Sequence, residues 1–162
     1  DSDSAKIQAL NEMIEVQKQM GWNLLLNEHL FLHQGSDSIA VIGVENVGDP
    51  PFTVYGDLKA SYPDLSDNVV KILLSHNPVH WANEIANKND VNIDLTLSGH
   101  THAMQFRLGN FSPSAWIYPE WGGLYTEGAQ SLYVNTGLGS VMIPYRFGAW
   151  PEISVITLSR KK

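Results

Sequence analysis

Two stretches of the sequence decide the fold: VVKILLSHNP at residues 69–78 and IDLTLSGHTH at residues 93–102. Each begins with a short apolar run, 69–74 and 93–97, which is typical of a β-strand buried on both faces of a sheet. Residues 81–88, between the two runs, are predicted to form a helix. Strand, helix and strand in this order predict a βαβ unit with two parallel strands that end at the same edge of the sheet. The predicted fold class is therefore α/β.

Both predicted strands are followed by histidine. His76 follows the first strand, and His100 and His102 follow the second. Ligands of open α/β sheets bind outside the carboxyl ends of the strands, so we expect the three imidazoles to face a common cleft. Neutral imidazole is a ligand for Zn, Fe and Mn, which makes the three side chains candidate metal ligands. Taken alone, His76 is also explained as a hydrogen-bonded residue at a strand end.

Composition excludes several classes of protein. The chain has 162 residues, 43% of them hydrophobic, and no cysteine, which fits one folded domain without disulfides or thiolate zinc sites. Ten Lys and Arg against 17 Asp and Glu give a net charge of −7, so binding to nucleic acid through the overall charge of the chain is not expected. The first residue is Asp1 rather than Met, and we expect a processed chain or a part of a longer protein.

The remaining elements are predicted from periodicity and turn residues. A helix is expected at 4–20, a short helix at 57–62, and a long loop, rich in Gly, Pro and aromatics, at 110–128. Turns or breaks are expected at 35–37, at 49–51 and at Pro63. Further short strands are expected at 23–26, 30–33, 38–44, 131–135 and 153–158.

The segments that contain the histidines, ILLSHNP at 72–78 and LSGHTH at 97–102, resemble the last two signature blocks of the calcineurin-like metallophosphoesterases. LYVNTGLG at 132–139, IPYR at 143–146 and PEI at 151–153 resemble the tail of a bacterial, often membrane-associated subgroup of this family. Some members of that subgroup hydrolyse UDP-diacylglucosamine-type pyrophosphates. The resemblance covers roughly residues 69–160.

The resemblance implies a layered β-sandwich flanked by helices, in αββα order, with a centre of two divalent ions (Mn, Fe or Zn). His76 and His100 would bind one ion and His102 the other. In the complete domain it implies hydrolysis of a phosphodiester or pyrophosphate, in which the ions polarise the phosphoryl oxygens and lower the pKa of a bridging water. The implied substrate is a phosphoester small molecule or a lipid-linked nucleotide.

The sequence departs from the family pattern before His76. The Asp-x-His, Gly-Asp-x-x-Asp/Asn and Gly-Asn-His-Asp/Glu blocks are not found, and they supply the remaining ligands and the catalytic histidine. We therefore expect residues 1–162 to be the C-terminal half of one domain whose other metal-binding blocks lie before residue 1. This half alone is expected to bind at most one ion weakly and to lack activity. A membrane anchor before Asp1 is left open.

If the other half of the domain is missing, apolar residues of the strands at 69–74 or 93–97 should lack the side chains that normally cover them. We then expect either a homodimer through the uncovered face of the sheet or a large exposed apolar patch. The family prefers Gly at the positions of Ala103 and Met104, and the larger residues are expected to narrow the floor beside the metals.

Other side chains are weaker candidates for substrate binding. Arg146 is a candidate for a phosphate oxygen, with an ion pair to Glu152 as the alternative. Aromatic residues of the predicted loop are candidates for a lid or an apolar landing surface, with packing of the loop onto the sheet as the alternative. These aromatic residues are Trp116, Tyr118, Trp121 and Tyr125. Surface or packing roles are expected for His29, His33 and His80.

Two functions of other classes are compatible with the same residues. One is a non-catalytic module in which the acidic surface and the aromatic loop contact a protein partner. The other is a metal-binding protein that uses the three histidines without hydrolysis.

Overall fold

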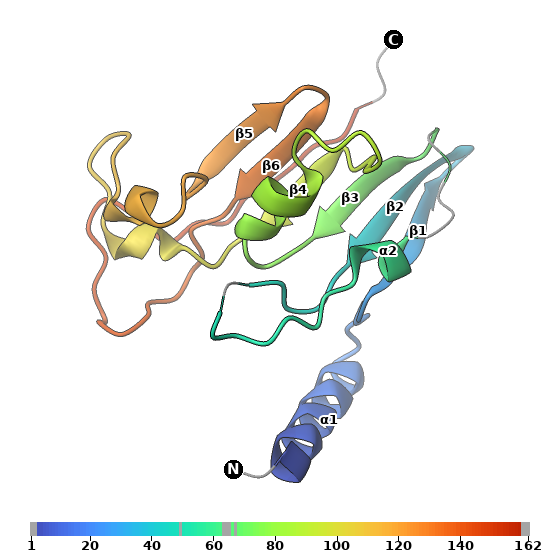
Figure 1. Cartoon of the computed structure of the whole chain (residues 1–162), viewed down its shortest axis with the longest axis horizontal. Helices are drawn as coiled ribbons and strands as arrows, with labels where there is room; N and C mark the ends of the chain where they lie inside the picture. Colours follow the sequence, from blue (N-terminus) through green and yellow to red (C-terminus); the bar gives the residue numbers. More distant parts are fainter. Residues whose placement is uncertain (1–2, 49, 63–65, 67, 160–162) are drawn as a thin grey trace.

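The computed structural model describes residues 3–48, 50–62, 66 and 68–159. Six strands form one mixed sheet in the order β1-β2-β3-β4-β6-β5, as Figure 1 shows. The internal pairs β2–β3, β3–β4 and β4–β6 are parallel, and the two edge pairs are antiparallel. The strands are β1 (Glu28–Gln34), β2 (Asp37–Gly43), β3 (Val70–Leu74), β4 (Leu95–Ser98), β5 (Gly123–Glu127) and β6 (Gln130–Val134). The α/β class predicted from the sequence is confirmed.

The predicted βαβ unit is present. β3 and β4 are parallel neighbours, with Ile72 opposite Leu95 and Leu74 opposite Leu97. The helix between them is a π-helical turn, η1 (Trp81–Ile85), which is shorter than the predicted 81–88. Both strands therefore end at one edge of the sheet, which is the condition for the three histidines to face a common cleft.

One face of the sheet carries the hydrophobic core. Ile42, Leu73 and Leu132 point to this face from three strands and are fully buried. The core is covered by η1 and by the short helix α2 (Leu58–Ser61), both of which lie in front of the sheet in Figure 1. α2 confirms the helix predicted at 57–62, and it begins where Asp57 Oδ1 accepts from the amide of Ala60 at 2.9 Å.

The opposite face of the sheet is partly uncovered. The strand register places Leu32, Val70, Leu74 and Leu124 on this face, and all four are exposed. Val70 is 44% and Leu74 41% exposed, so β3 is not buried on both faces along its whole length. The exposure agrees with the expectation that strand residues lack cover.

The first helix stands away from the sheet. α1 (Asp3–Gln19) matches the helix predicted at 4–20 and projects from the body of the molecule in Figure 1. Its apolar residues Ile7, Leu10 and Met13 are exposed. No helix among the described residues is long and apolar enough to cross a membrane.

Three sequence predictions are wrong. Residues 23–26 form no strand, because Asn27 adopts a positive φ of 60° and turns the chain into β1. Residues 153–158 form no strand either, since they have no ladder partner among the described residues. The predicted loop at 110–128 contains a short helix, η3 (Pro113–Trp116), and β5, which pairs with β6 across a tight turn at Gly128 (φ 60°). The hairpin turn at 35–36 is confirmed, whereas Asp49 and Pro63, from two other predicted breaks, lie outside the described residues.

Candidate functional site

The first two predicted ligands lie in contact at the carboxyl ends of β3 and β4. The ring centroids of His76 and His100 are 5.1 Å apart, and their planes are nearly perpendicular at 84°. The amide of Gly99 donates to the carbonyl of His76 at 3.0 Å. A Cβ at Gly99 would lie 3.9 Å from His76 Nδ1, so the His76 ring packs directly over this backbone. The parallel strands thus bring two residues 24 positions apart to one point.

His102 lies near this pair, close enough to affect His76 electrostatically. Its ring lies against Gly137, where a Cβ would be 3.3 Å from Nδ1. Burial lowers the pKa of His76, and the nearby His102 lowers the pKa of His76 further. The three imidazoles therefore share one site, and His76 favours the neutral form that a metal requires.

Protein groups already occupy some of the ring nitrogens. His100 Nε2 is 2.9 Å from Tyr118 Oη, and His102 Nδ1 is 3.0 Å from Arg146 Nη2. A guanidinium only donates, so Nδ1 of His102 accepts and the neutral ring carries its proton on Nε2. Within the described ranges, no group of three or more His, Asp or Glu side chains is arranged to hold a metal ion.

The backbone after His100 adopts an unusual conformation. His102, Ala103, Met104 and Gln105 have φ values of 49°, 51°, 46° and 59°, which form a left-handed turn. Such a conformation costs about 1–2 kcal/mol per residue for L-amino acids and very little for glycine. Glycine at Ala103 and Met104 would relieve this strain. The Met104 side chain is 41% exposed. Methionine in place of the family's glycine therefore strains the backbone at least as much as it fills space beside the histidines.

Hydroxyl groups hold the left-handed turn. Thr101 Oγ1 accepts from the amide of Ala103 at 3.2 Å and donates to the carbonyl of Trp121 at 2.6 Å. Ser112 Oγ donates to the carbonyl of Ala103 at 2.7 Å. Ala103, Trp121 and Ala149 form a small buried cluster beneath the turn. Of the predicted substrate-binding aromatics, Trp121 thus packs under the site, and Tyr125 packs against the main core from β5.

Gln105 connects the turn to a distant loop, and the sequence reasoning missed it. Its amide is buried, and Nε2 donates to the carbonyls of Ile143 at 2.9 Å and Tyr145 at 2.8 Å. Oε1 accepts from the amide of Val141. The Gln105 side chain therefore fastens the segment before Arg146, and the Gln105 carbonyl accepts from the amide of Phe147 directly after it. The sequence feature that could have pointed to Gln105 is its position directly after the segment HTHAM, residues 100–104.

Arg146 binds backbone carbonyls rather than Glu152. Its Nε donates to Gly139 at 2.8 Å, Nη1 to Ala149 at 3.0 Å and Nη2 to Thr136 at 2.8 Å, besides the contact with His102. The alternative of an Arg146–Glu152 ion pair is wrong, because Glu152 is bound by other groups. These are Tyr133 Oη, Ser154 Oγ and the amide and hydroxyl of Thr136. A contact between Arg146 and a phosphate stays a prediction.

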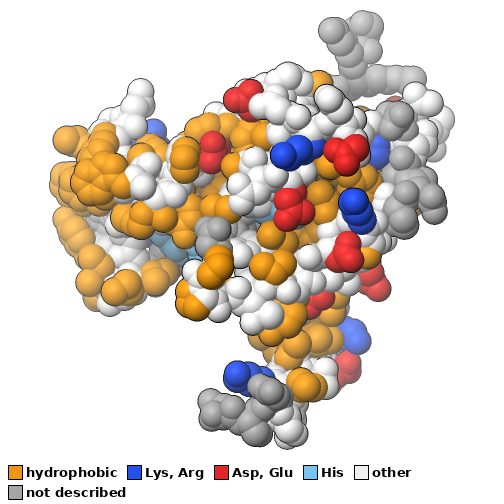
Figure 2. All heavy atoms as spheres, in the orientation of Figure 1, with side chains coloured by type: hydrophobic (Ala, Val, Ile, Leu, Met, Phe, Trp, Pro, Cys, Tyr) orange, Lys and Arg blue, Asp and Glu red, His pale blue; other side chains and the backbone are white. Residues whose placement is uncertain are grey.

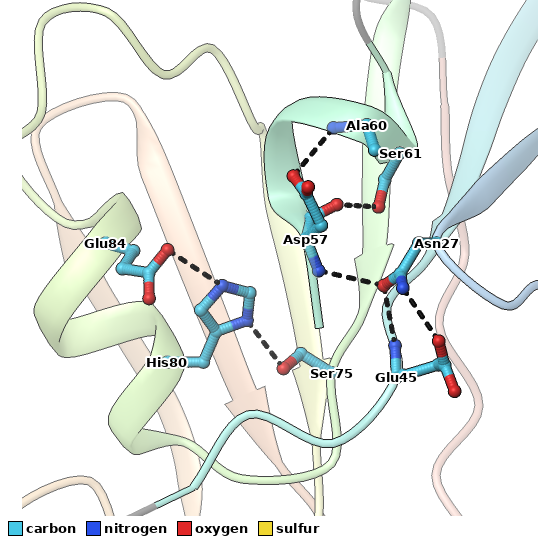
Figure 3. A network of polar contacts seen from close by, with 8 residues as sticks. All are labelled: Asn27, Glu45, Asp57, Ala60, Ser61, Ser75, His80 and Glu84. Carbon is cyan, nitrogen blue, oxygen red and sulfur yellow. Dashed lines mark hydrogen bonds and ion pairs between the residues drawn. The ribbon is translucent and has the colours of Figure 1, made fainter. Parts of the chain in front are cut away.

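A buried polar pair joins Ser75 and His80, which lie on either side of His76 in the sequence; Figure 3 shows the pair. Ser75 Oγ and His80 Nδ1 are 2.8 Å apart, and His80 Nε2 lies 3.7 Å from Glu84. Burial lowers the pKa of His80 and outweighs the opposite effect of Glu84. Ser75 and His80 are both almost fully buried, so this arrangement is no accessible nucleophile and instead stabilises the loop of residues 75–80, which contains His76. The packing role predicted for His80 is confirmed.

A pocket of about 680 Å³ lies elsewhere, between α2 and η1. Lys59, Glu84 and Asp90 are among its lining residues, and none of His76, His100 and His102 lines it. We place the candidate site at the histidines, because they lie in the two segments that resemble the family's signature blocks and two of their rings are in contact.

Comparisons with known proteins find metallophosphoesterases among the relatives of the chain. No protein-family model matches the chain, and no solved structure matches it. The chain is 40% identical over 107 residues to the uncharacterised metallophosphoesterase YkuE of Bacillus subtilis, covering 63% of this chain and 35% of YkuE. It is 26% identical over 148 residues to the uncharacterised metallophosphoesterase YkoQ of the same organism, covering 86% and 50%. It is 28% identical over 155 residues to the UDP-2,3-diacylglucosamine pyrophosphatase LpxG of Chlamydia trachomatis, covering 89% and 44%.

The fold and these similarities define the class: the chain is related to the metallophosphoesterases, which supports the resemblance to the calcineurin-like family. LpxG is among these relatives. The chain spans about a third to a half of the length of these relatives.

Proposed function

We propose that this chain is the C-terminal part of a metal-dependent phosphoester hydrolase domain and that His76, His100 and His102 bind its divalent metal. The observation that supports the proposal is the meeting of three imidazoles at the ends of two parallel strands in a chain similar to metallophosphoesterases. The names of these relatives indicate divalent metal as the family's general cofactor.

The described residues fit only part of a two-metal centre. Three neutral imidazoles bring no negative charge, whereas two divalent ions call for carboxylate ligands. No Asp or Glu joins the histidines among the described residues. We therefore propose that blocks preceding residue 1 supply the carboxylates and the catalytic groups. The chain alone then holds at most one ion (Mn, Fe or Zn), weakly, and does not hydrolyse.

The chain's own residues prepare the histidines for this role. Burial keeps His76 in its neutral, ligating form, and the Ser75–His80 pair holds the loop that presents it. Arg146 donates to Nδ1 of His102 while the ring proton lies on Nε2, so His102 can bind the metal ion only after Arg146 has released Nδ1. As substrate we propose a phosphodiester or pyrophosphate, either a small molecule or a lipid-linked nucleotide, as the name of the LpxG relative suggests for that protein.

The test is hydrolysis of bis-p-nitrophenyl phosphate with added manganese. It compares the chain of 162 residues with a version that is extended upstream to include the missing blocks. We expect turnover only in the extended protein, and we expect His100→Ala to abolish it. No metal-dependent turnover in the extended protein would overturn the proposed function. Metal-dependent turnover in the short chain would overturn the proposed inactivity.

A metal-binding module without hydrolysis is the second candidate. It rests on the same contact between the His76 and His100 rings and requires no catalytic group. Titration calorimetry with zinc separates the two. Zinc binding that depends on His76 and His100, together with an extended protein that is inactive, would support the module over the enzyme.

A further inference from the structure

The hydrogen-bond ladder between β3 and β4 changes register where the strands end. The amide of Ser75 donates to the carbonyl of Leu97 at 3.1 Å, as a parallel ladder requires. The next bond of a regular ladder would join the amide of Gly99 to the carbonyl of Ser75, but the Gly99 amide donates to the carbonyl of His76 instead, at 3.0 Å. This shift by one residue pairs the segments that carry His76 and His100, and it deprives the Ser75 carbonyl of its amide partner.

The hydroxyl group of Ser98 takes the place of that amide. Ser98 Oγ donates to the carbonyl of Ser75 at 2.6 Å, and we call this bond the Ser75–Ser98 bridge. Both residues are buried, with exposed fractions of 2% for Ser75 and 8% for Ser98. A buried carbonyl that loses its hydrogen bond is strongly unfavourable, so the bridge stabilises the shifted register.

Ser75 is held from a second side by His80. Ser75 Oγ lies 2.8 Å from Nδ1 of His80, whose ring is almost fully buried. The other ring nitrogen, Nε2, forms no hydrogen bond within the described part of the chain. The carbonyl of Ser75 is thus fixed by a residue of β4, and its hydroxyl by a residue of the turn after β3.

Hydrogen bonds continue from Ser98 to the third histidine. The amide of Asn135, directly after β6, donates to the carbonyl of Ser98 at 2.8 Å. Asn135 Oδ1 accepts from the amide of Gly137 at 2.7 Å, and the His102 ring lies against Gly137. Ser98 therefore connects the ends of three strands, because its hydroxyl binds the segment after β3 and its carbonyl binds the segment after β6.

The position of His76 depends on these backbone anchors. The His76 side chain is partly open to solvent, whereas its neighbours Ser75 and Asn77 are buried. In Figure 2 the histidine side chains that can be seen lie in recesses between other side chains. The buried main chain at Ser75 therefore determines where the His76 ring stands, and the Ser75–Ser98 bridge fixes that main chain relative to β4.

We propose that Ser98 is a positioning residue that sets the separation between the rings of His76 and His100. His80 supports it from the other side of Ser75. The inference rests on the proposed function, in which the two rings bind metal. Residues that hold metal ligands without touching the ion typically change the metal affinity by about 10–100-fold when they are replaced. Ser98 affects the metal in this way, through the geometry of the two histidines.

The test compares Ser98→Ala with Thr96→Val in the chain of 162 residues. Ser98→Ala removes the bridge. Thr96→Val removes a buried hydroxyl of the same strand that forms no hydrogen bond among the described residues, so it is the matched control. NMR spectra of the histidine ring Cε1–H groups are recorded without metal, and titration calorimetry measures the affinity for zinc. Urea unfolding measures the stability of each variant.

We expect Ser98→Ala to shift the resonances of His76 and His100 and to weaken zinc binding about 10-fold. Thr96→Val should leave both as in wild type, and Ser98→Thr, which keeps a hydroxyl, should restore most of the affinity. Ser75→Ala removes the contact with His80 but keeps the bridge. It should also weaken zinc binding, and it replaces Ser98→Ala if that variant does not fold.

A Ser98→Ala protein that is less stable but keeps the ring resonances and zinc affinity of wild type would overturn the proposal. An equal loss of zinc affinity in Thr96→Val would overturn it as well. Wild type that binds no zinc would contradict the proposed function instead. In that case the ring resonances of the metal-free variants still decide whether Ser98 positions the two histidines.

Discussion

Arg146 donates from Nη2 to Nδ1 of His102 across 3.0 Å, although the two residues lie 44 positions apart in the sequence. The contact exists because Gln105 fastens the loop around Arg146 to the left-handed turn that follows His102. A candidate metal ligand, a strained turn and the loop that carries Arg146 are therefore held together as one structural unit.

We expect Gln105→Leu to lower the free energy of unfolding by about 1–3 kcal/mol. The substitution removes three hydrogen bonds and leaves backbone groups of Val141, Ile143 and Tyr145 without their partner. Urea unfolding measures the change. Gln8→Leu is the matched control on the exposed surface of α1, and we expect it to change stability by less than about 0.5 kcal/mol. Equal effects of the two substitutions would contradict the role given to Gln105.

We expect Met104→Gly to stabilise the protein by about 0.5–1 kcal/mol. The relief of the left-handed φ of 46° exceeds the added entropy of glycine in the unfolded chain, and little packing is lost at a half-exposed side chain. Met13→Gly is the control, because Met13 is similarly exposed but lies inside α1, where glycine costs about 1 kcal/mol. Thermal melting of both variants measures the two changes in stability, which we expect to have opposite signs. A lower melting temperature for Met104→Gly would show that the turn is not strained.

Stability should depend on pH through Glu152. Burial alone would raise the pKa of Glu152, but hydrogen bonds from Tyr133, Ser154 and Thr136 outweigh it and hold the pKa below its usual value. A lowered pKa in the folded state means that the stabilisation is complete above the unfolded value of 4.5 and is lost as the pH falls through the folded pKa.

Glu152→Gln tests this dependence. We expect the substitution to destabilise the protein at neutral pH and to have little effect in acid, where Glu152 itself is protonated. Urea unfolding of both proteins across the acidic range gives the difference. A difference that stays constant down to the lowest pH would contradict the lowered pKa.

Removing the Tyr118 hydroxyl should strengthen metal binding, if the proposed function is correct. His100 Nε2 pairs with Tyr118 Oη, and a metal ion at Nε2 must displace that hydroxyl. We expect Tyr118→Phe to raise the zinc affinity of the chain by about 2–10-fold, as measured by titration calorimetry. Tyr145→Phe, at an exposed position of the loop before Arg146, is the control and should leave the affinity unchanged. An unchanged affinity in Tyr118→Phe would show that Nε2 of His100 is not a ligand.

We propose that the uncovered face of the sheet joins two copies of the chain. Val70 and Leu74 are exposed on this face, and a charge at either position would oppose burial against a second copy. Light scattering should show a dimer for wild type and a monomer for Leu74→Asp. Phe52→Asp, at an exposed position outside the sheet, should remain a dimer. A monomeric wild type would contradict the proposed dimer.

The sequence alone determined the central βαβ unit and the meeting of His76 with His100. Both follow from local patterns, since an apolar run of strand length is readable without tertiary information and parallel strands end at one edge. The family resemblance was readable for the same reason, because the two histidine blocks are continuous segments. The β5–β6 hairpin was missed where aromatic and glycine-rich residues were interpreted as a loop.

Only the tertiary structure decided how the histidines are held. The left-handed turn at 102–105 contains no glycine, so no local preference predicts its positive φ values. Hydroxyl groups of Thr101 and Ser112 and the amide of Gln105 maintain it through contacts with distant backbone. The pairing of Arg146 with His102 likewise depends on a loop more than thirty residues downstream of the turn. Contacts of this kind have no signature in sequence spacing, because they exist only after the chain has folded.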